Sequence, residues 1–335
     1  MPRGAASFRT EETPIAAAYR RFAETEAHGR SPLYEELASG VAADPTIIEF
    51  LLTLPREKRQ PNLLLAAARS LCGTPSDWVE FRRNIITNAG ALRQVMLTRS
   101  TQTNEPGRCA ILLPLLARLP QPLALLEVGA SAGLCLLPDR YGYDYDGHLL
   151  RPEAAWPEPP IFPCAPAATM PLPSILPQVA WRAGLDLNPI DVNDPAEAAW
   201  LETLVWPEQT ARLARLRAAM AIAAMVRPRL TKGDLRHDLV ALAAEMPREA
   251  TRVIFHTAVL AYVSPQSARE AFARSVGGLC DVWIANEAPH VFPDVTARAD
   301  AAPLSGRFLV SQNGTPVAWA DPHGAAVDWI AEPSG

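Results

Sequence analysis

The stretch Leu123–Leu134 holds the residues of this chain whose types and spacing best fit a chemical function. It reads LALLEVGASAGL, so an apolar run ends in Glu127 and passes directly into a turn of small residues, which we expect to open a helix. A continuous apolar run is typical of a buried parallel strand. Small residues let a ligand approach the backbone where the next helix begins. The pattern predicts a turn that binds a nucleotide-like ligand.

Three kinds of ligand chemistry compete for this turn. The dinucleotide fingerprint G-x-G-x-x-G has Gly129 but Ser131 and Leu134 at its other glycine positions. The serine-hydrolase pattern G-x-S-x-G matches Gly129 to Gly133 letter for letter. The first motif of class I S-adenosylmethionine (SAM) methyltransferases, acid-x-G-x-G-x-G, fits with Glu127 as the acid and Ser131 in place of the middle glycine. A tight strand–helix turn without any ligand is the fourth alternative.

The hydrolase alternative makes Ser131 the nucleophile, with His323 as base and Asp294 as its orienting acid, in the chain order that such enzymes require. In that fold the nucleophile turn follows several strands, yet no strand is predicted before Leu123. A methyltransferase places the turn after the first strand of its sheet, so a helical preface favours that interpretation.

Composition restricts the class of protein. The 335 residues are 49% hydrophobic, and the net charge of −5 gives no basic footprint for nucleic acid. Arg212, Arg215 and Arg217 are expected on a solvated helix face. The five scattered cysteines favour reduced thiols, a cytoplasmic location and no zinc site. We see no signal peptide and no apolar run that spans a membrane.

Residues 11–118 read as helices, with start signals at Ser31-Pro32, Asp44-Pro45 and Thr74-Pro75. We therefore expect an all-α N-terminal domain over residues 1–120. After it, strands alternate with helices, which implies a parallel sheet.

The expected strands of the second domain, residues 121–335, are 123–128, 179–187, 229–232, 253–263 (a strand with its exit loop) and 281–287, and Asn313-Gly314 predicts a hairpin between 307–311 and 316–320. The fold class is α/β: a class I SAM-methyltransferase-like Rossmann sheet with a C-terminal antiparallel hairpin. It carries a Pro-rich insertion at 150–178, expected as an ordered arm, and a helical insertion at 188–226.

Polar residues stand where these strands end, and ligands of open α/β sheets bind beyond those ends. Asp186 closes the second strand and could accept both ribose hydroxyls, whereas Asp234 after the third strand could accept the adenine amino group. The predicted cofactor-binding set is Glu127, Gly129, Ala130, Ser131, Gly133, Asp186, Leu187, Asp234, Leu235, His256 and Thr257.

The chain resembles the bacterial domain-of-unknown-function family 2332 over nearly its whole length. The segments that carry the resemblance are TQTNE (101–105), LLEVGASAGL (125–134), LLPDRY (136–141), RAGLDLNP (182–189), WPE (206–208), GD (233–234), FHTAVLAY (255–262) and ADPHG (320–324). The resemblance implies a SAM-methyltransferase-like Rossmann domain behind a helical region and assigns no activity. Cys135 departs from the family pattern, where asparagine is expected.

The sequence offers fewer candidate residues for catalysis than for binding. His256 could act as general base for an acceptor hydroxyl, and Glu287 is the second candidate catalytic residue. Gln102, Asn104, Glu105 and Arg108 form a candidate lid over the ligand, although Asn104 could equally cap a helix. His290 and His323 do not make a metal pair. We expect SAM as cofactor, a small-molecule substrate, no nucleic-acid or membrane partner, and make no prediction of the oligomeric state. A non-catalytic SAM- or nucleotide-binding protein is the alternative.

Overall fold

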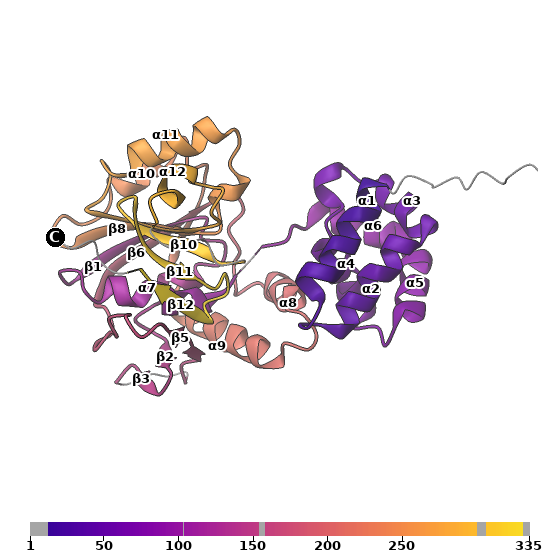
Figure 1. The fold of residues 1–335 in the computed structure, drawn as a ribbon, viewed down its shortest axis with the longest axis horizontal. Coiled ribbons are helices and arrows are strands. Elements are labelled where there is room, and N and C mark those ends of the chain that lie inside the picture. Colours follow the sequence, from indigo (N-terminus) through magenta and orange to yellow (C-terminus); the bar gives the residue numbers. More distant parts are fainter. Residues whose placement is uncertain (1–12, 103, 154–157, 300–305, 331–335) are drawn as a thin grey trace, which may run out of the picture. The chain divides into compact units, whose positions relative to one another are not determined.

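The computed structural model describes residues 13–102, 104–153, 158–299 and 306–330 (Figure 1). The chain divides into two compact units. One comprises Met1–Gln102 with Ala199–Thr210, and the other comprises Thr103–Ala198 with Ala211–Gly335. Residues 1–12, 103, 154–157, 300–305 and 331–335 lie outside the described residues. They include Thr103 of the TQTNE segment and part of the Pro-rich insertion.

The first unit contains a series of short helices. They are α1 (Pro14–Arg21), a π-helix (Phe22–Ala27), α2 (Pro32–Ala43), α3 (Pro45–Leu52), a 3-10 helix (Arg56–Lys58), α4 (Pro61–Cys72), α5 (Trp78–Thr87) and α6 (Ala89–Thr98). Ser31 and Asp44 cap α2 and α3, as predicted. The start predicted at Thr74-Pro75 is wrong, because Asp77 caps the helix instead and accepts the Glu80 amide at 2.8 Å.

The core of the first unit extends beyond its N-terminal helices. Leu37, Leu51 and Leu64 are fully buried there, and Trp200 belongs to the same cluster with Trp206 packed against it. The Trp206 ring lies 5.6 Å from the Tyr34 ring. These two tryptophans come from the segment predicted as a helical insertion, whose α8 (Pro195–Leu204) crosses from the second unit into the first.

The second unit is built on a mostly parallel nine-stranded sheet, ordered β5-β12-β11-β10-β9-β8-β1-β6-β7. Its strands are β1 (Leu123–Val128), β5 (Ala165–Pro166), β6 (Val179–Asp186), β7 (Arg229–Lys232), β8 (Thr251–Thr257), β9 (Val282–Glu287), β10 (Phe308–Gln312), β11 (Thr315–Ala320) and β12 (Ala326–Trp329). The five strands from β7 to β9 are parallel, and β10 begins the antiparallel part. The expected strands and hairpin are present.

Helices α9 (Thr210–Val226), α10 (Leu239–Ala243) and α11 (Gln266–Val276) lie in the connections between parallel strands. Helix α7 (Cys109–Leu116) precedes β1, and α12 (Pro293–Thr296) lies between β9 and the antiparallel β10. Side chains of α10 and α11 pack with Leu126, Ile254 and Trp283 in one apolar cluster, which covers one face of the sheet (Figure 1).

The connection between β1 and β6 differs from expectation. The turn after β1 opens only a 3-10 helix, Leu134–Leu136, instead of an α-helix. Pro138 follows so closely that no α-helix can continue, since a proline removes one helical hydrogen bond and disfavours helix in the residue before it. A small three-stranded sheet replaces the helix, with the order β3 (His148–Leu150), β2 (Gly142–Tyr145) and β4 (Ile161–Pro163).

The Pro-rich segment contributes strands. β4 pairs with β2, and β5 pairs with β12 at the edge of the large sheet. Prolines are tolerated at such edges because an edge strand leaves some N–H groups unpaired. Neither these short strands nor β12 was predicted, because each is only two to four residues long and carries no alternating pattern.

Candidate functional site

The turn after β1 uses its backbone N–H groups within the protein. Three residues of the turn have positive φ: 75° at Gly129, 47° at Ser131 and 68° at Gly133. The five amides from Gly129 to Gly133 donate, in chain order, to Leu185 O twice, Asp186 Oδ2, Asn104 Oδ1 and Ala130 O. An anion-binding turn needs N–H groups directed at its ligand. As the structure describes it, this turn presents no such donor to a phosphate.

Small residues at this turn are required by packing. A Cβ added to Gly129 would lie 2.1 Å from Val259 Cγ2, in the loop after β8. A Cβ added to Gly184 in β6 would lie 2.3 Å from the Cβ of Ala130. Three segments therefore meet at the turn at distances that leave no room for a larger side chain.

Glu127, the acidic residue of β1, lines a small cavity beside this turn. The cavity measures about 20 Å³ and is also lined by Asn104, Glu105, Arg108, Cys135 and Thr257. Glu127 is 3% exposed, and its Oε2 has no hydrogen-bond partner. Burial raises the pKa of this carboxyl well above its usual range, and the nearby Arg108 charge offsets only part of the rise.

The segment before α7 closes this cavity. The Asn104 amide donates to Ser131 Oγ at 2.8 Å and accepts the Ala132 N–H at 3.0 Å. Arg108 is buried, and its Nη1 donates to both the carbonyl oxygen and Oγ1 of Thr257 at 3.0 and 3.2 Å. Three predicted lid residues, Asn104, Glu105 and Arg108, are thus brought to the predicted turn.

Glu105 links this segment to His323, which the sequence placed only in the hydrolase alternative, and to Arg212, which it did not place in the site. Its Oε2 accepts from Arg212 Nε at 2.5 Å and lies 3.9 Å from His323 Nδ1. Partial burial and then the Arg212 charge lower the pKa of His323 to about 4. Arg212 was expected on a solvated helix face and is instead paired in this cluster. The ADPHG segment pointed to His323, whereas the α9 pattern gave no signal for Arg212.

The acids after β6 and β7 occupy different surroundings. Asp186 is half-buried and accepts the Ser131 and Asn188 amides, both at 2.7 Å. Leu187 beside it is 67% exposed. Asp234 pairs with Arg236, whose hydrogen bonds lower the Asp234 pKa to about 2. The next residue, Leu235, packs against the apolar cluster of the sheet.

His256 and Glu287 lie on the opposite face of the sheet from Glu127. His256 is fully buried, its Nδ1 lies 2.7 Å from Glu287 Oε1, and its Nε2 accepts from Trp283 Nε1 at 3.0 Å. Glu287 Oε1 also accepts the Val259 and Leu260 amides at 2.9 and 3.0 Å. Both ring nitrogens of His256 are therefore engaged, and the catalytic roles of these two residues stay predictions.

The remaining predicted residues are Gln102 and the three residues of the alternative hydrolase triad. Gln102 belongs to the first unit, so its place relative to the turn is not described. In the alternative hydrolase triad, Ser131 contacts Asn104, His323 lies by Glu105, and Asp294 lies in α12. The described contacts of Ser131 and His323 are thus with residues outside the triad, and no contact among the three triad residues is described.

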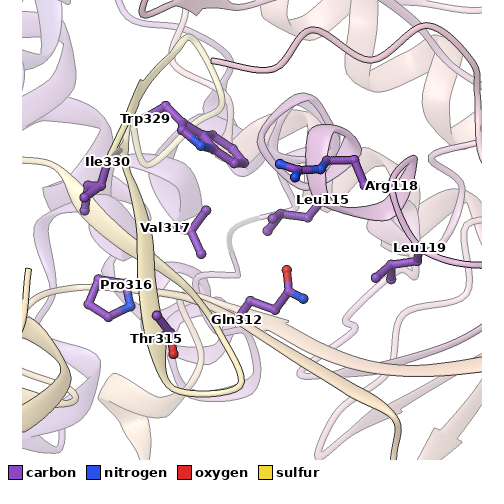
Figure 2. Close-up of a pocket in the computed structure, with 9 residues that line it drawn as sticks. All are labelled: Leu115, Arg118, Leu119, Gln312, Thr315, Pro316, Val317, Trp329 and Ile330. Atoms are coloured by element: carbon purple, nitrogen blue, oxygen red, sulfur yellow. The ribbon is translucent and has the colours of Figure 1, made fainter. Parts of the chain in front are cut away.

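Two larger hollows lie in the second unit. One, about 310 Å³, is formed by the end of α7 and the β10–β12 strands, and Figure 2 shows Leu115, Val317 and Trp329 lining it. It lies at the amino end of the parallel strands, away from the edge where open α/β sheets bind ligands. The other, about 550 Å³, borders the turn at Ala132 and is lined by the loop after β6, including Ile190 and Asp191.

Comparison with known proteins identifies a family and goes no further. Residues 16–329 match the model of a family described as uncharacterized protein conserved in bacteria, DUF2332. The chain belongs to this family. No curated protein and no solved structure matches it. Among the described residues of this DUF2332 protein, no helix is both long and apolar enough to cross a membrane.

Proposed function

We propose that this DUF2332 protein binds SAM at the carboxyl ends of β1, β6 and β7 and transfers its methyl group to a small molecule. The order of its parallel strands along the sheet is third, second, first, fourth, fifth. This order supports a class I methyltransferase sheet of Rossmann type, here following an all-α N-terminal domain. The cysteines described as free support a reducing, cytoplasmic location.

One observation carries the proposal: the unpartnered carboxylate oxygen of Glu127 in its cavity. A buried carboxylate without a partner is costly, and native proteins rarely keep one without a use. The amides of the neighbouring turn are engaged, so the site attracts a cation rather than a phosphate. SAM carries an ammonium and a sulfonium charge, whereas dinucleotides carry phosphates.

Acidic residues at the ends of the neighbouring strands could bind the ribose and the adenine of SAM. Asp186 accepts two backbone amides, and a carboxylate has about four lone-pair positions, so it can accept ribose hydroxyls as well. The exposed Leu187 supplies an apolar surface for a base. Asp234 stays ionised above pH of about 2 and would share its oxygens between Arg236 and an adenine amino group.

Bound SAM supplies an electrophilic methyl group. The residues of this chain would hold it: Glu127 at the ammonium and Asp186 at the ribose. The hollow of about 550 Å³ beside Ala132 falls in the size range of small-molecule sites, which supports a small acceptor. His256 would act as a base only if it released Trp283 or Glu287, because each of its ring nitrogens is engaged.

That engagement of His256 favours the second candidate function, a SAM-binding protein without methyl transfer. The hydrolase alternative finds less support. An oxyanion hole needs the N–H of the residue after the nucleophile, and the Ala132 N–H donates to Asn104.

Isothermal titration calorimetry of the full chain with SAM, its demethylated product, NAD and ATP tests the proposal. We expect binding of SAM and of its demethylated product, and none of NAD. Tight binding of NAD or ATP without SAM would exclude the proposed cofactor. A second assay measures transfer of the radiolabelled methyl group from SAM to a small-molecule extract. Transfer would show an enzyme, and binding without transfer would show a non-catalytic SAM-binding protein.

A further inference from the structure

The hollow of about 550 Å³ beside the turn has an apolar interior. Ala132, Ile190 and Ala223 line it and are buried. The half-buried apolar residues that complete its wall are Pro189, Val192, Pro228 and Leu230. Small-molecule sites measure about 300–1,000 Å³ and are lined mostly by apolar side chains. The interior therefore suits the apolar body of an ordinary small molecule.

The polar residues that line this hollow are exposed, and they are Asp191, Asn193 and Arg227. Asp191 Oδ1 accepts from the backbone and side-chain N–H groups of Asn193, at 2.8 and 2.9 Å. These hydrogen bonds lower the pKa of Asp191, and the positive charge of Arg227 lowers it further. The two opposite charges thus lie close enough to interact, although no hydrogen bond or ion pair between them is described.

Arg227 directly follows α9 in an unusual backbone conformation. Its φ is 51°, and its amide donates to Ala223 O at 2.8 Å. Glycine is the usual residue in this left-handed position after a helix, and a side chain there strains the backbone. A basic residue inside the last turn would interact as well with the helix dipole without that strain. The backbone therefore gives no reason for an arginine at this position, and the reason must lie in its side chain.

The end of the Arg227 side chain is available to a ligand. Its Nε makes a long hydrogen bond of 3.4 Å to Ala224 O, and no acceptor among the described residues pairs with Nη1 or Nη2. A guanidinium can bind a carboxylate through two parallel N–H groups. Asp191 already closes its own loop, whereas no such partner is described for these two nitrogens. The charge that the hollow offers to a ligand is therefore positive.

We propose that Arg227 selects the methyl acceptor, a small acid whose apolar body lies in the hollow and whose carboxylate binds the Arg227 guanidinium. The inference rests on the proposed function for the transfer itself and goes further by naming the chemical class of the acceptor. Arg227 is a specificity-determining residue, since it binds the acceptor and takes no part in the transfer.

Three probes of similar shape and different charge test the proposal by calorimetry on the full chain. They are 2-naphthoate, 2-naphthamide and 2-naphthylmethylamine, which are an anion, a neutral molecule and a cation at neutral pH. We expect the acid to bind about tenfold more tightly than the amide, because a charge-assisted contact at an exposed side chain keeps part of its strength in water. Equal affinities for the acid and the amide would overturn the proposal. Tightest binding of the amine would assign recognition to Asp191 and overturn it as well.

Substitutions locate the contact. Arg227→Gln should weaken naphthoate about tenfold and leave the affinity for naphthamide unchanged. Arg227→Gly should weaken naphthoate equally and raise the melting temperature, since glycine adopts a positive φ without strain. Arg248→Gln, at an exposed arginine outside the hollow, is the matched control and should alter neither affinity. Unchanged binding of naphthoate by both Arg227 variants would refute the assignment.

Val192→Trp places a large side chain in the hollow and should abolish binding of both naphthoate and naphthamide. Circular dichroism and the melting temperature verify that this variant folds. Undiminished binding of both probes by the folded variant would place their site elsewhere and overturn the proposal.

Titration of naphthoate in the presence of saturating SAM separates this inference from the proposed function. We expect both molecules to bind together. If they compete, the hollow belongs to the cofactor site, so the acceptor assignment is overturned while SAM binding stands. If naphthoate binds through Arg227 and SAM does not bind, recognition of an acid stands and the methyltransferase proposal fails. Binding of SAM without binding of naphthoate would refute this inference alone.

Discussion

Glu127 and Glu287 are the same residue type at the ends of strands in one sheet, yet their surroundings differ. Both are nearly fully buried, at 3% and 2% exposure. Glu287 Oε1 accepts from His256 and from two backbone amides, whereas its Oε2 has no partner, like Oε2 of Glu127. Glu127 has no hydrogen bond among the described residues and borders a cavity.

The difference separates a structural acid from a binding acid. Glu287 ties the loop after β8 to β9, so its hydrogen bonds are used within the fold. Glu127 is held at a comparable depth without such bonds, so its carboxyl group is available to a ligand, and its charged form costs stability until one binds. Substitutions on the two faces test this division.

The largest effect is expected at His256. His256→Ala removes the partner of Trp283 Nε1 and one of the three partners of Glu287 Oε1 at a fully buried position, and breaking such a buried pair costs about 3–5 kcal/mol. Urea denaturation should show this loss, with SAM affinity unchanged in the folded fraction. A small loss of stability with a large loss of SAM affinity would instead place His256 in the ligand site.

Gly129→Ala should cost about 3 kcal/mol, because its Cβ would overlap Val259 and its φ is positive. Gly147→Ala is the matched control: φ is 96° there, and nothing lies within 4 Å of the added Cβ. It should cost about 1 kcal/mol. Thermal denaturation of the two variants separates steric overlap from backbone strain, and equal losses would contradict the close packing at the turn.

Glu127→Gln should stabilise the protein without ligand by about 1–3 kcal/mol near pH 8. The pKa of Glu127 is raised by burial, with Cys135 and Asp186 adding to the rise and Arg108 opposing it. The stability that its protonated form contributes is present in acid and is lost as the pH rises through the raised pKa. The gain from Gln should therefore shrink toward pH 5. A pH-independent gain in urea denaturation would contradict this assignment.

Asp186→Ala should weaken SAM about tenfold to a hundredfold by removing charge-assisted hydrogen bonds to the ribose. The variant also frees the Ser131 amide, so folding needs verification by circular dichroism. Asp191→Ala is the comparison, since Asp191 is exposed and accepts from Asn193 in its own loop. If only Asp191→Ala loses affinity in parallel titrations, the ribose site lies one loop further along the chain.

Periodicity and end signals predicted most elements of the large sheet because these elements bury continuous apolar runs. β7 has the predicted bounds, and β9 begins one residue later than predicted. β8 begins two residues earlier than predicted and ends at Thr257, so the rest of the predicted span 253–263 is its exit loop. No α-helix follows the turn, and Pro138 was a local signal against one. The sequence prediction gave more weight to the glycine motif, which is typical of a turn that opens a helix. Strands as short as β5 form only because a distant partner, β12, completes their hydrogen bonds.

The site was predictable in part for a related reason. Strand ends meet at one edge, so Glu127, Asp186 and Thr257 could be grouped from the sequence. The face on which each side chain lies depends on the register of its strand. His256 and Thr257 are adjacent in β8, so their side chains lie on opposite faces of the sheet. The Arg212–Glu105 pair joins residues 107 positions apart, which no local pattern encodes.

The smallest effect is expected at Ser131. Ser131→Gly relieves a positive φ of 47°, which costs a non-glycine residue about 1–2 kcal/mol, and it removes the hydrogen bond from Asn104, which contributes about 0.5–1.5 kcal/mol. These terms nearly cancel, so stability should change by less than about 1 kcal/mol and SAM affinity should be kept or slightly improved. Calorimetry measures the affinity. A fluorophosphonate probe that labels the wild type but not Ser131→Ala would show a nucleophilic serine, and the turn would then belong to a hydrolase rather than to a SAM site.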